Sequence, residues 1–151
     1  MLDVSIFFDG ACSNNGAKVM GIGVIAKIHL SGVNIGEMYV VRNYGVGTSN
    51  EAEWMGCCEA MRLIKRVEEK YGKCDTIQVF SDSQVISSQF NGKYNINSEH
   101  LRKYYTLAIQ LKEATNFKGY VKWIKRNFNQ EADKMSKIGL CCKYEHFNFK
   151  I

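Results

Sequence analysis

Three strand-like runs follow one another at the start of the chain, with no helical segment between them. They occupy residues 2–8 (LDVSIFF), 20–30 (MGIGVIAKIHL) and 37–44 (EMYVVRNY), and polar or glycine-containing turns separate them. Such short apolar runs, bounded by turn residues, are typical of β-strands. Three strands in series with short connections indicate an antiparallel meander.

Helices and strands alternate in the rest of the chain. Apolar residues recur at helical spacing after residue 48, where Thr48 and Glu51 fit a capping box, and Gly72 is a natural end for this helix. The next segments are predicted as a strand at 75–83, a short helix at 83–90, a helix at 98–114 capped by Ser98, a strand at 119–126 and a helix at 129–140 capped by Asn129. This order predicts an α/β protein with a five-stranded mixed sheet and helices on both faces.

Length and charge limit the class of protein. A chain of 151 residues suits one domain with one core, so we expect a single domain over 1–151. Residues 1–92 carry 8 Lys/Arg and 10 Asp/Glu, whereas residues 93–151 carry 12 and 5, which gives −2 and +7. The basic second half indicates either a polyanionic partner or a solvated lysine-rich surface.

The chain has no sequence signal for a membrane or for secretion. No stretch approaches the roughly 18 apolar residues of a membrane span, and no basic region followed by an apolar run opens the chain. The six cysteines show no C-x-x-C spacing, so we interpret Cys57 and Cys58 as small core residues of a reducing compartment. We therefore expect a cytoplasmic protein without a membrane partner.

Four carboxylates stand at strand ends and helix starts. Asp9 ends the first strand, Glu53 lies early in the first long helix, Asp82 ends the fourth strand, and Asp133 lies one turn into the last helix. Each has a plain structural reading as a turn, cap or solvated helix residue. Together they indicate a site, because clustered carboxylates repel one another unless a cation such as magnesium holds them. Two such ions roughly 4 Å apart can activate water and steady the leaving oxygen of a phosphodiester.

Four segments in the same order resemble the ribonuclease H type 1 family. They are FFDGACSNNG (7–16), TSNEAEW (48–54), VFSDSQ (79–84) and IKRNFNQEADKMS (124–136), the last with the R-x-x-N-x-x-A-D pattern. The resemblance covers residue 4 to about residue 140. The chain resembles a short form of the family, without its basic handle and without its N-terminal hybrid-binding domain.

The resemblance implies a ribonuclease H-like fold and an endoribonuclease that hydrolyses the RNA strand of RNA–DNA hybrids. It implies two magnesium ions, with manganese as an alternative, held by Asp9, Glu53, Asp82 and Asp133. A metal-activated water would attack the phosphorus and leave 3′-hydroxyl and 5′-phosphate ends. The expected partner is the RNA–DNA hybrid, and we expect a monomer with no obligate protein partner.

Eight residues are carried over as substrate contacts by their places in these motifs. They are Cys12, Ser13, Asn15, Thr48, Ser49, Asn50, Arg126 and Asn129. Those beside Asp9 and Glu53 would meet RNA 2′-hydroxyls and base edges, since a 2′-hydroxyl both donates and accepts hydrogen bonds. The hydroxyl of Thr48, at a helix N-terminus, would meet a DNA phosphate. Capping and turn chemistry explains several of these residues equally well.

The chain also departs from the family pattern. Many members carry a histidine in the loop before the last aspartate, whereas this chain has none between His100 and His146, and Phe128 stands beside Asn129. Residues 91–100 take the place of the handle, so we expect hybrid affinity that is weak and falls with salt.

Two alternative functions stay open. One is another nuclease of this fold, from a retroelement or of integrase or exonuclease type. The exonuclease pattern D-x-E is absent at Asp9-Gly10-Ala11, and so is the zinc module typical of integrases. The other is a catalytically silent nucleic-acid-binding module, although silent relatives usually lose a carboxylate.

Overall fold

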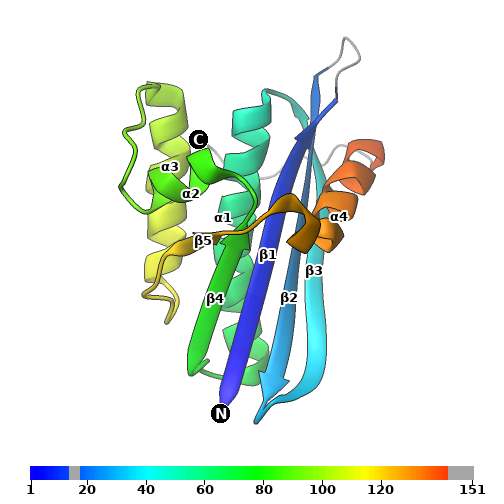
Figure 1. Ribbon diagram of the computed structural model, residues 1–151, viewed down its shortest axis with the longest axis vertical. Coiled ribbons are helices and arrows are strands. Elements are labelled where there is room, and N and C mark those ends of the chain that lie inside the picture. Colours follow the sequence, from blue (N-terminus) through cyan, green and yellow to red (C-terminus); the bar gives the residue numbers. More distant parts are fainter. Residues whose placement is uncertain (14–17, 143–151) are drawn as a thin grey trace.

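The computed structural model describes residues 1–13 and 18–142 of the chain. Its elements are β1 (Leu2–Cys12), β2 (Val19–Leu30), β3 (Val33–Val46), α1 (Ser49–Tyr71), β4 (Thr76–Ser81), α2 (Gln84–Phe90), α3 (Glu99–Glu113), β5 (Val121–Trp123), the 3₁₀ helix η1 (Arg126–Phe128) and α4 (Gln130–Cys141). The five strands form one sheet in the order β3-β2-β1-β4-β5 (Figure 1). β1, β2 and β3 pair antiparallel, whereas β4 and β5 pair parallel, which confirms the predicted mixed sheet with its meander.

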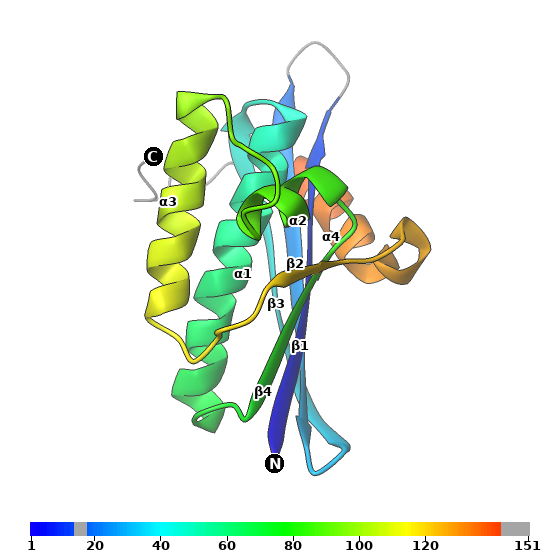
Figure 2. The same ribbon diagram turned by 60° about the vertical axis from the view of Figure 1, so that its left-hand side comes forward.

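Helices cover both faces of the sheet, as predicted. α1 and α3 lie side by side on one face, and α4 lies on the other (Figure 2). The alternation along β1 explains this arrangement, because Val4, Ile6 and Phe8 are buried and Phe8 lies against α1 at Gly56. On the opposite face, a Cβ at Gly23 would lie 2.4 Å from Cβ of Met135, so α4 packs directly on the backbone of β2.

Several strand boundaries differ from the prediction. β1 runs to Cys12 rather than to residue 8, because its ladder with β2 continues as far as the pair Cys12 and Met20. β3 is longer than predicted at both ends. β5 stops at Trp123 instead of reaching residue 126, because the chain turns there into η1. The residues from Ile124 onward therefore leave the sheet and lead through η1 into α4.

The charged residue Glu59 is buried in the core. It lies on α1, which also buries Trp54, Cys57 and Cys58, and this confirms the two cysteines as core residues. Glu59 is 1% exposed and lies 3.1 Å from the Nε atom of Arg42 on β3. Such a buried carboxylate is tolerated only when it is paired, so this contact couples α1 to the outer strand of the meander. Within the described residues, no helix has the length and apolar character needed to cross a membrane.

Candidate active site

Asp9 and Asp82 lie toward the same end of two neighbouring strands, Asp9 within β1 and Asp82 directly after β4. β1 and β4 are parallel, with Phe7 opposite Phe80 and Phe8 opposite Ser81. The rings of Phe7 and Phe80 are stacked, with their centroids 4.9 Å apart, and fix this register. The two carboxylates therefore lie side by side, as predicted, but Asp9 does not end its strand, because the ladder of β1 with β2 continues to Cys12.

The first turns of α1 bring Glu53 to the same place. A Cβ at Gly10 would lie 2.3 Å from the carbonyl carbon of Ala52, so only glycine lets α1 approach β1 this closely. As a result Asp9, Glu53 and Asp82 each offer a carboxylate oxygen to one group in which all these atoms lie within 4.8 Å of one another. Three segments far apart in the sequence thus meet in one cluster.

Asp133 lies beside this cluster but outside it. It is in the first turns of α4, and it is close enough to Asp9 for a side-chain hydrogen bond that raises the pKa of Asp9. Its Oδ2 atom also accepts a hydrogen bond from Lys137, 3.2 Å away on the next turn of the helix. The structure therefore groups three of the predicted carboxylates tightly and places the fourth next to them.

Burial in the cluster raises the pKa values of its acids, most of all that of Asp9. Burial, followed by the charges of Asp82 and Glu53, raises the pKa of Asp9 to about 9. Burial also raises the pKa values of Glu53 and Asp82, against the opposing effect of Arg126 on both and of Asn129 on Asp82. A cation that replaced the proton would relieve this repulsion.

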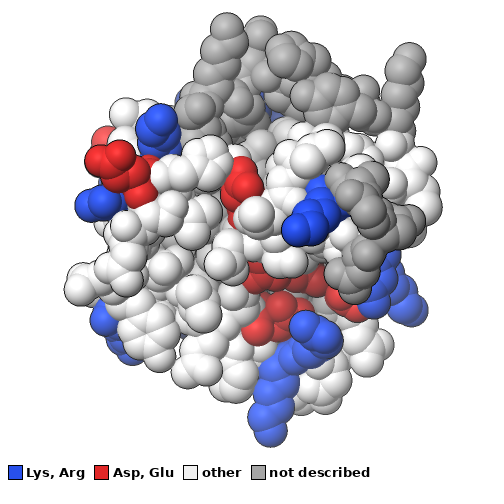
Figure 3. Space-filling view, turned by 90° about the horizontal axis from the view of Figure 1, so that it is seen from above, with Lys and Arg blue, Asp and Glu red and all other residues white. Residues whose placement is uncertain are grey.

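The chemistry of the donors fits a hard divalent cation. All three groups are carboxylates, and Oδ2 of Asp82 is buried without a hydrogen-bond partner among the described residues. Figure 3 shows acidic side chains gathered in a hollow at this end of the molecule, with basic side chains beside them. Oxygen ligands of this kind are those that magnesium and manganese prefer.

The loop after β1 is held to the neighbouring segments. The thiol of Cys12 lies 3.3 Å from the carbonyl oxygen of Gly47, and the hydroxyl of Ser13 accepts a hydrogen bond of 2.9 Å from the amide of Val19. These contacts give both residues a structural role beside the expected role in substrate binding. Asn15 lies outside the described residues.

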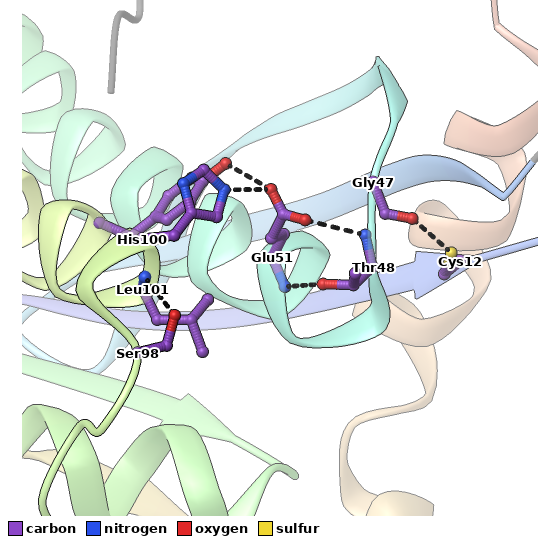
Figure 4. A network of polar contacts seen from close by, with 8 residues as sticks. Cys12, Gly47, Thr48, Glu51, Ser98, His100 and Leu101 are labelled. Atoms are coloured by element: carbon purple, nitrogen blue, oxygen red, sulfur yellow. Dashed lines mark hydrogen bonds and ion pairs between the residues drawn. The ribbon is translucent and has the colours of Figure 1, made fainter.

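A hydrogen-bond network fixes the start of α1 (Figure 4). Thr48 and Glu51 form the predicted capping box, and Ser49 and Asn50 are exposed in the first turn. Oε2 of Glu51 lies 2.7 Å from Nε2 of His100.

Two side chains of α3, His100 and Tyr104, contact the carboxylate of Glu51. Its Oε2 atom, which lies beside His100, also accepts a hydrogen bond of 3.1 Å from the hydroxyl of Tyr104. Burial raises the pKa of Glu51, but the hydrogen bonds from His100, Tyr104 and Thr48 outweigh burial and lower it. The capping box was readable in the sequence, whereas no local signal pointed to its partners in α3.

The last motif contains one correction. Asn129 occupies the position before α4, but its side chain makes no capping hydrogen bond. Instead its Nδ2 atom donates to the carbonyl oxygen of Phe8 at 3.0 Å, and the residue is 1% exposed. Arg126 is exposed in η1, where its charge acts on Glu53 and Asp82. Sequence reasoning also missed that the indole of Trp123 donates to the carbonyl oxygen of Asp82 at 3.2 Å.

Known proteins share this architecture. The crystal structure of ribonuclease H1 from the halophilic archaeon Halobacterium salinarum is 24% identical over 92% of this chain and 98% of that chain, with a TM-score of 0.75. The LC11 ribonuclease H1 in complex with an RNA/DNA hybrid is 22% identical over 91% of this chain and 96% of that chain, with a TM-score of 0.76.

The same fold occurs in the N-terminal ribonuclease H domain of Rv2228c from Mycobacterium tuberculosis, solved as a fusion with maltose-binding protein. It is 22% identical over 91% of this chain and 98% of that chain, with a TM-score of 0.74. The model of the family described as reverse transcriptase-like matches residues 7–139. The chain therefore belongs to the reverse transcriptase-like family and has the ribonuclease H fold.

Proposed function

We propose that this protein is an endoribonuclease that hydrolyses the RNA strand of RNA–DNA hybrids and leaves 3′-hydroxyl and 5′-phosphate ends. The observation that carries the proposal is the cluster of Asp9, Glu53 and Asp82, in which an oxygen of Asp82 is buried with no hydrogen-bond partner in the described part of the chain. The relative of this fold in complex with an RNA/DNA hybrid supports the choice of substrate.

The carboxylate cluster is the proposed metal site. Asp9, Glu53 and Asp82 would hold divalent ions, with Asp133 beside them as a further ligand. Magnesium or manganese, two ions in our proposal, would supply Lewis-acid activation of water and of the phosphodiester. Among the described residues, the metal-ligating group consists of carboxylates without a cysteine or histidine, so hydrolysis by water suits it better than covalent catalysis.

Arg126 supplies positive charge from the chain itself at this site. It is exposed, and its charge opposes the rise that burial causes in the pKa values of Glu53 and Asp82. A guanidinium in this place favours the ionised form of both carboxylates and can attract the phosphate of an approaching strand. Asn129 is buried, so we assign it a positioning role, because it ties the start of α4 to the end of β1.

The start of α1 is the proposed contact for the sugar–phosphate backbones. Ser49 and Asn50 are exposed in the first turn, where backbone amides have no partner within the helix. Such amides attract phosphate groups, and the two side chains offer hydrogen bonds to a 2′-hydroxyl. The network through Glu51 and His100 keeps this turn in place before the substrate arrives.

Cleavage of a labelled RNA–DNA hybrid tests the proposal. The hybrid, duplex RNA, duplex DNA and single-stranded RNA are incubated with magnesium or manganese, beside the variant Asp82→Asn and the control variant Glu37→Gln on the exposed surface of β3. We expect cleavage of the hybrid alone, loss of cleavage in Asp82→Asn and no change in Glu37→Gln. Cleavage of no substrate with either metal would contradict the proposal and favour a silent binding module.

A further inference from the structure

A groove separates α2 from the edge strand β5. Its volume is about 690 Å³, and side chains of both elements line it. Figure 1 shows α2 above β5, which is the edge strand next to β4. The side-chain amide of Asn91 bridges the two elements, because its Nδ2 donates to the carbonyl oxygen of Val121 at 2.8 Å and its Oδ1 accepts from the amide of Val121 at 2.9 Å. The outer edge of β5 is thus paired, and the groove is a built feature of the fold.

The walls of this groove have the chemistry of a nucleic-acid surface. Tyr120 is 68% exposed and Trp123 is 49% exposed, although aromatic side chains of this size are usually covered. Lys93 and Lys122 add two exposed positive charges. Among the described residues, none of the side chains that line the groove is acidic. Aromatic faces beside lysines are the combination that holds single-stranded nucleic acids, since bases stack and phosphates pair with the cations.

Trp123 joins the groove to the segment that carries one carboxylate of the cluster. The indole of Trp123 donates to the main-chain carbonyl of Asp82, whose side chain belongs to the cluster. The amide of Ile124, the next residue, donates to the carbonyl oxygen of Ser81 at 2.8 Å. The groove wall at Trp123 is therefore held directly beside Asp82.

We propose that this groove binds single-stranded RNA that extends beyond the hybrid, with bases stacked on Trp123 and Tyr120 and phosphates on Lys93 and Lys122. The inference rests on the proposed function, because the strand attacked at the carboxylates is then the RNA strand. It adds a preference to that function: the enzyme favours hybrids in which unpaired RNA continues from the duplex.

Binding of hybrids with and without overhangs tests the groove separately from hydrolysis. Fluorescence anisotropy in EDTA compares a blunt hybrid with hybrids that carry an unpaired RNA or DNA extension at either end. Base stacking at aromatic side chains and phosphate contacts predict a gain of about fivefold or more for an RNA extension. The gain should disappear in Tyr120→Ala/Lys122→Ala. The matched control, Tyr39→Ala/Lys65→Ala, replaces an exposed tyrosine and an exposed lysine elsewhere and should keep it.

Quenching of tryptophan emission gives a second readout, which is measured first on the wild-type protein. The chain has two tryptophans, and Trp54 is fully buried, so quenching by an added RNA 8-mer reports on Trp123. Trp123→Phe should lose the signal but keep the overhang gain. The proposal for the groove would be overturned by an equal gain in affinity with DNA extensions or by no gain with RNA extensions. It would also be overturned by a gain that survives in Tyr120→Ala/Lys122→Ala. If RNA extensions raise the affinity but the hybrid is not cleaved with either metal, the result would instead count against the proposed function.

Discussion

Replacing Asp9 with asparagine should stabilise the metal-free protein, and the gain should grow with pH. The pKa of Asp9 rises from 3.8 to about 9 on folding, so between these values the folded chain keeps a proton that the unfolded chain has lost. Such a group contributes stability at low pH and loses that contribution as the pH rises toward the folded pKa. Asparagine keeps the shape and the oxygen that accepts a hydrogen bond from the amide of Gly10, but it carries no proton to titrate.

The size of the effect follows from the difference between the pH of the solution and the pKa of Asp9 in the unfolded chain. At pH 7 the solution lies about three units above the ordinary pKa of aspartate, and each unit is worth about 1.4 kcal/mol. The upper value is therefore about 4 kcal/mol, and we expect at least about 2 kcal/mol because the neighbouring carboxylates share the protons of the cluster. Near pH 4 the gain should vanish, since Asp9 is then protonated in much of the unfolded population as well.

Urea unfolding in EDTA, followed by circular dichroism near pH 4 and near pH 7, measures this difference. Glu37→Gln, which removes an exposed carboxylate, serves as the control and should shift neither curve. Added magnesium should stabilise the wild type more than Asp9→Asn, because the ion needs the ionised carboxylate. A gain of equal size at both pH values, or a loss of stability at pH 7, would refute the reasoning.

Three further substitutions have effects that the structure sets. Glu59→Gln removes the buried negative charge that Arg42 and Arg62 contact and should cost about 2 kcal/mol in urea unfolding, whereas an unchanged midpoint would mean that a neutral amide serves these contacts equally well. Thr48→Ala removes the cap of α1 and should lower the free energy of unfolding by about 1 kcal/mol, and unchanged stability would contradict the capping role. The same variant should bind the hybrid less tightly in fluorescence anisotropy. Gly10→Ala forces a Cβ against the backbone at Ala52 and should lower both the melting temperature and any magnesium affinity measured by calorimetry, and wild-type values for both would show that α1 can shift without cost.

The sequence was most informative where the determinants are local. Thr48 and Glu51 mark the start of α1 because both partners of the capping box lie within one turn. The meeting of Asp9 and Asp82 was also predictable, because both follow residues that lie opposite each other once the two strands are adjacent and parallel, Phe8 and Ser81. These features depend on periodicity and topology alone.

Contacts between distant residues could not be predicted in the same way. Asn129 has the sequence position of a cap, but the carbonyl of Phe8 lies within its reach only after α4 has packed on the sheet. Glu59 stands in a helix among apolar residues, and its buried charge is explained by its pairing with Arg62 on the same helix and with Arg42 on β3, which is distant in sequence. The link between Glu51 and His100 joins residues 49 positions apart, so no local pattern contains it.

The side-chain amide of Asn91, which pairs with Val121 of β5, can also report on opening of this edge through deamidation. Asn91 precedes Gly92, and an asparagine followed by glycine loses ammonia readily when the glycine nitrogen can attack the side-chain carbonyl. In the folded chain both amide atoms of Asn91 are held by Val121, and the Gly92 amide donates to the carbonyl of Gln89. Deamidation at this step therefore requires local opening of this edge. The aspartate or isoaspartate it leaves has lost the amide donor to the carbonyl of Val121, so the extent of conversion in an aged sample would record how often this edge of the sheet has opened.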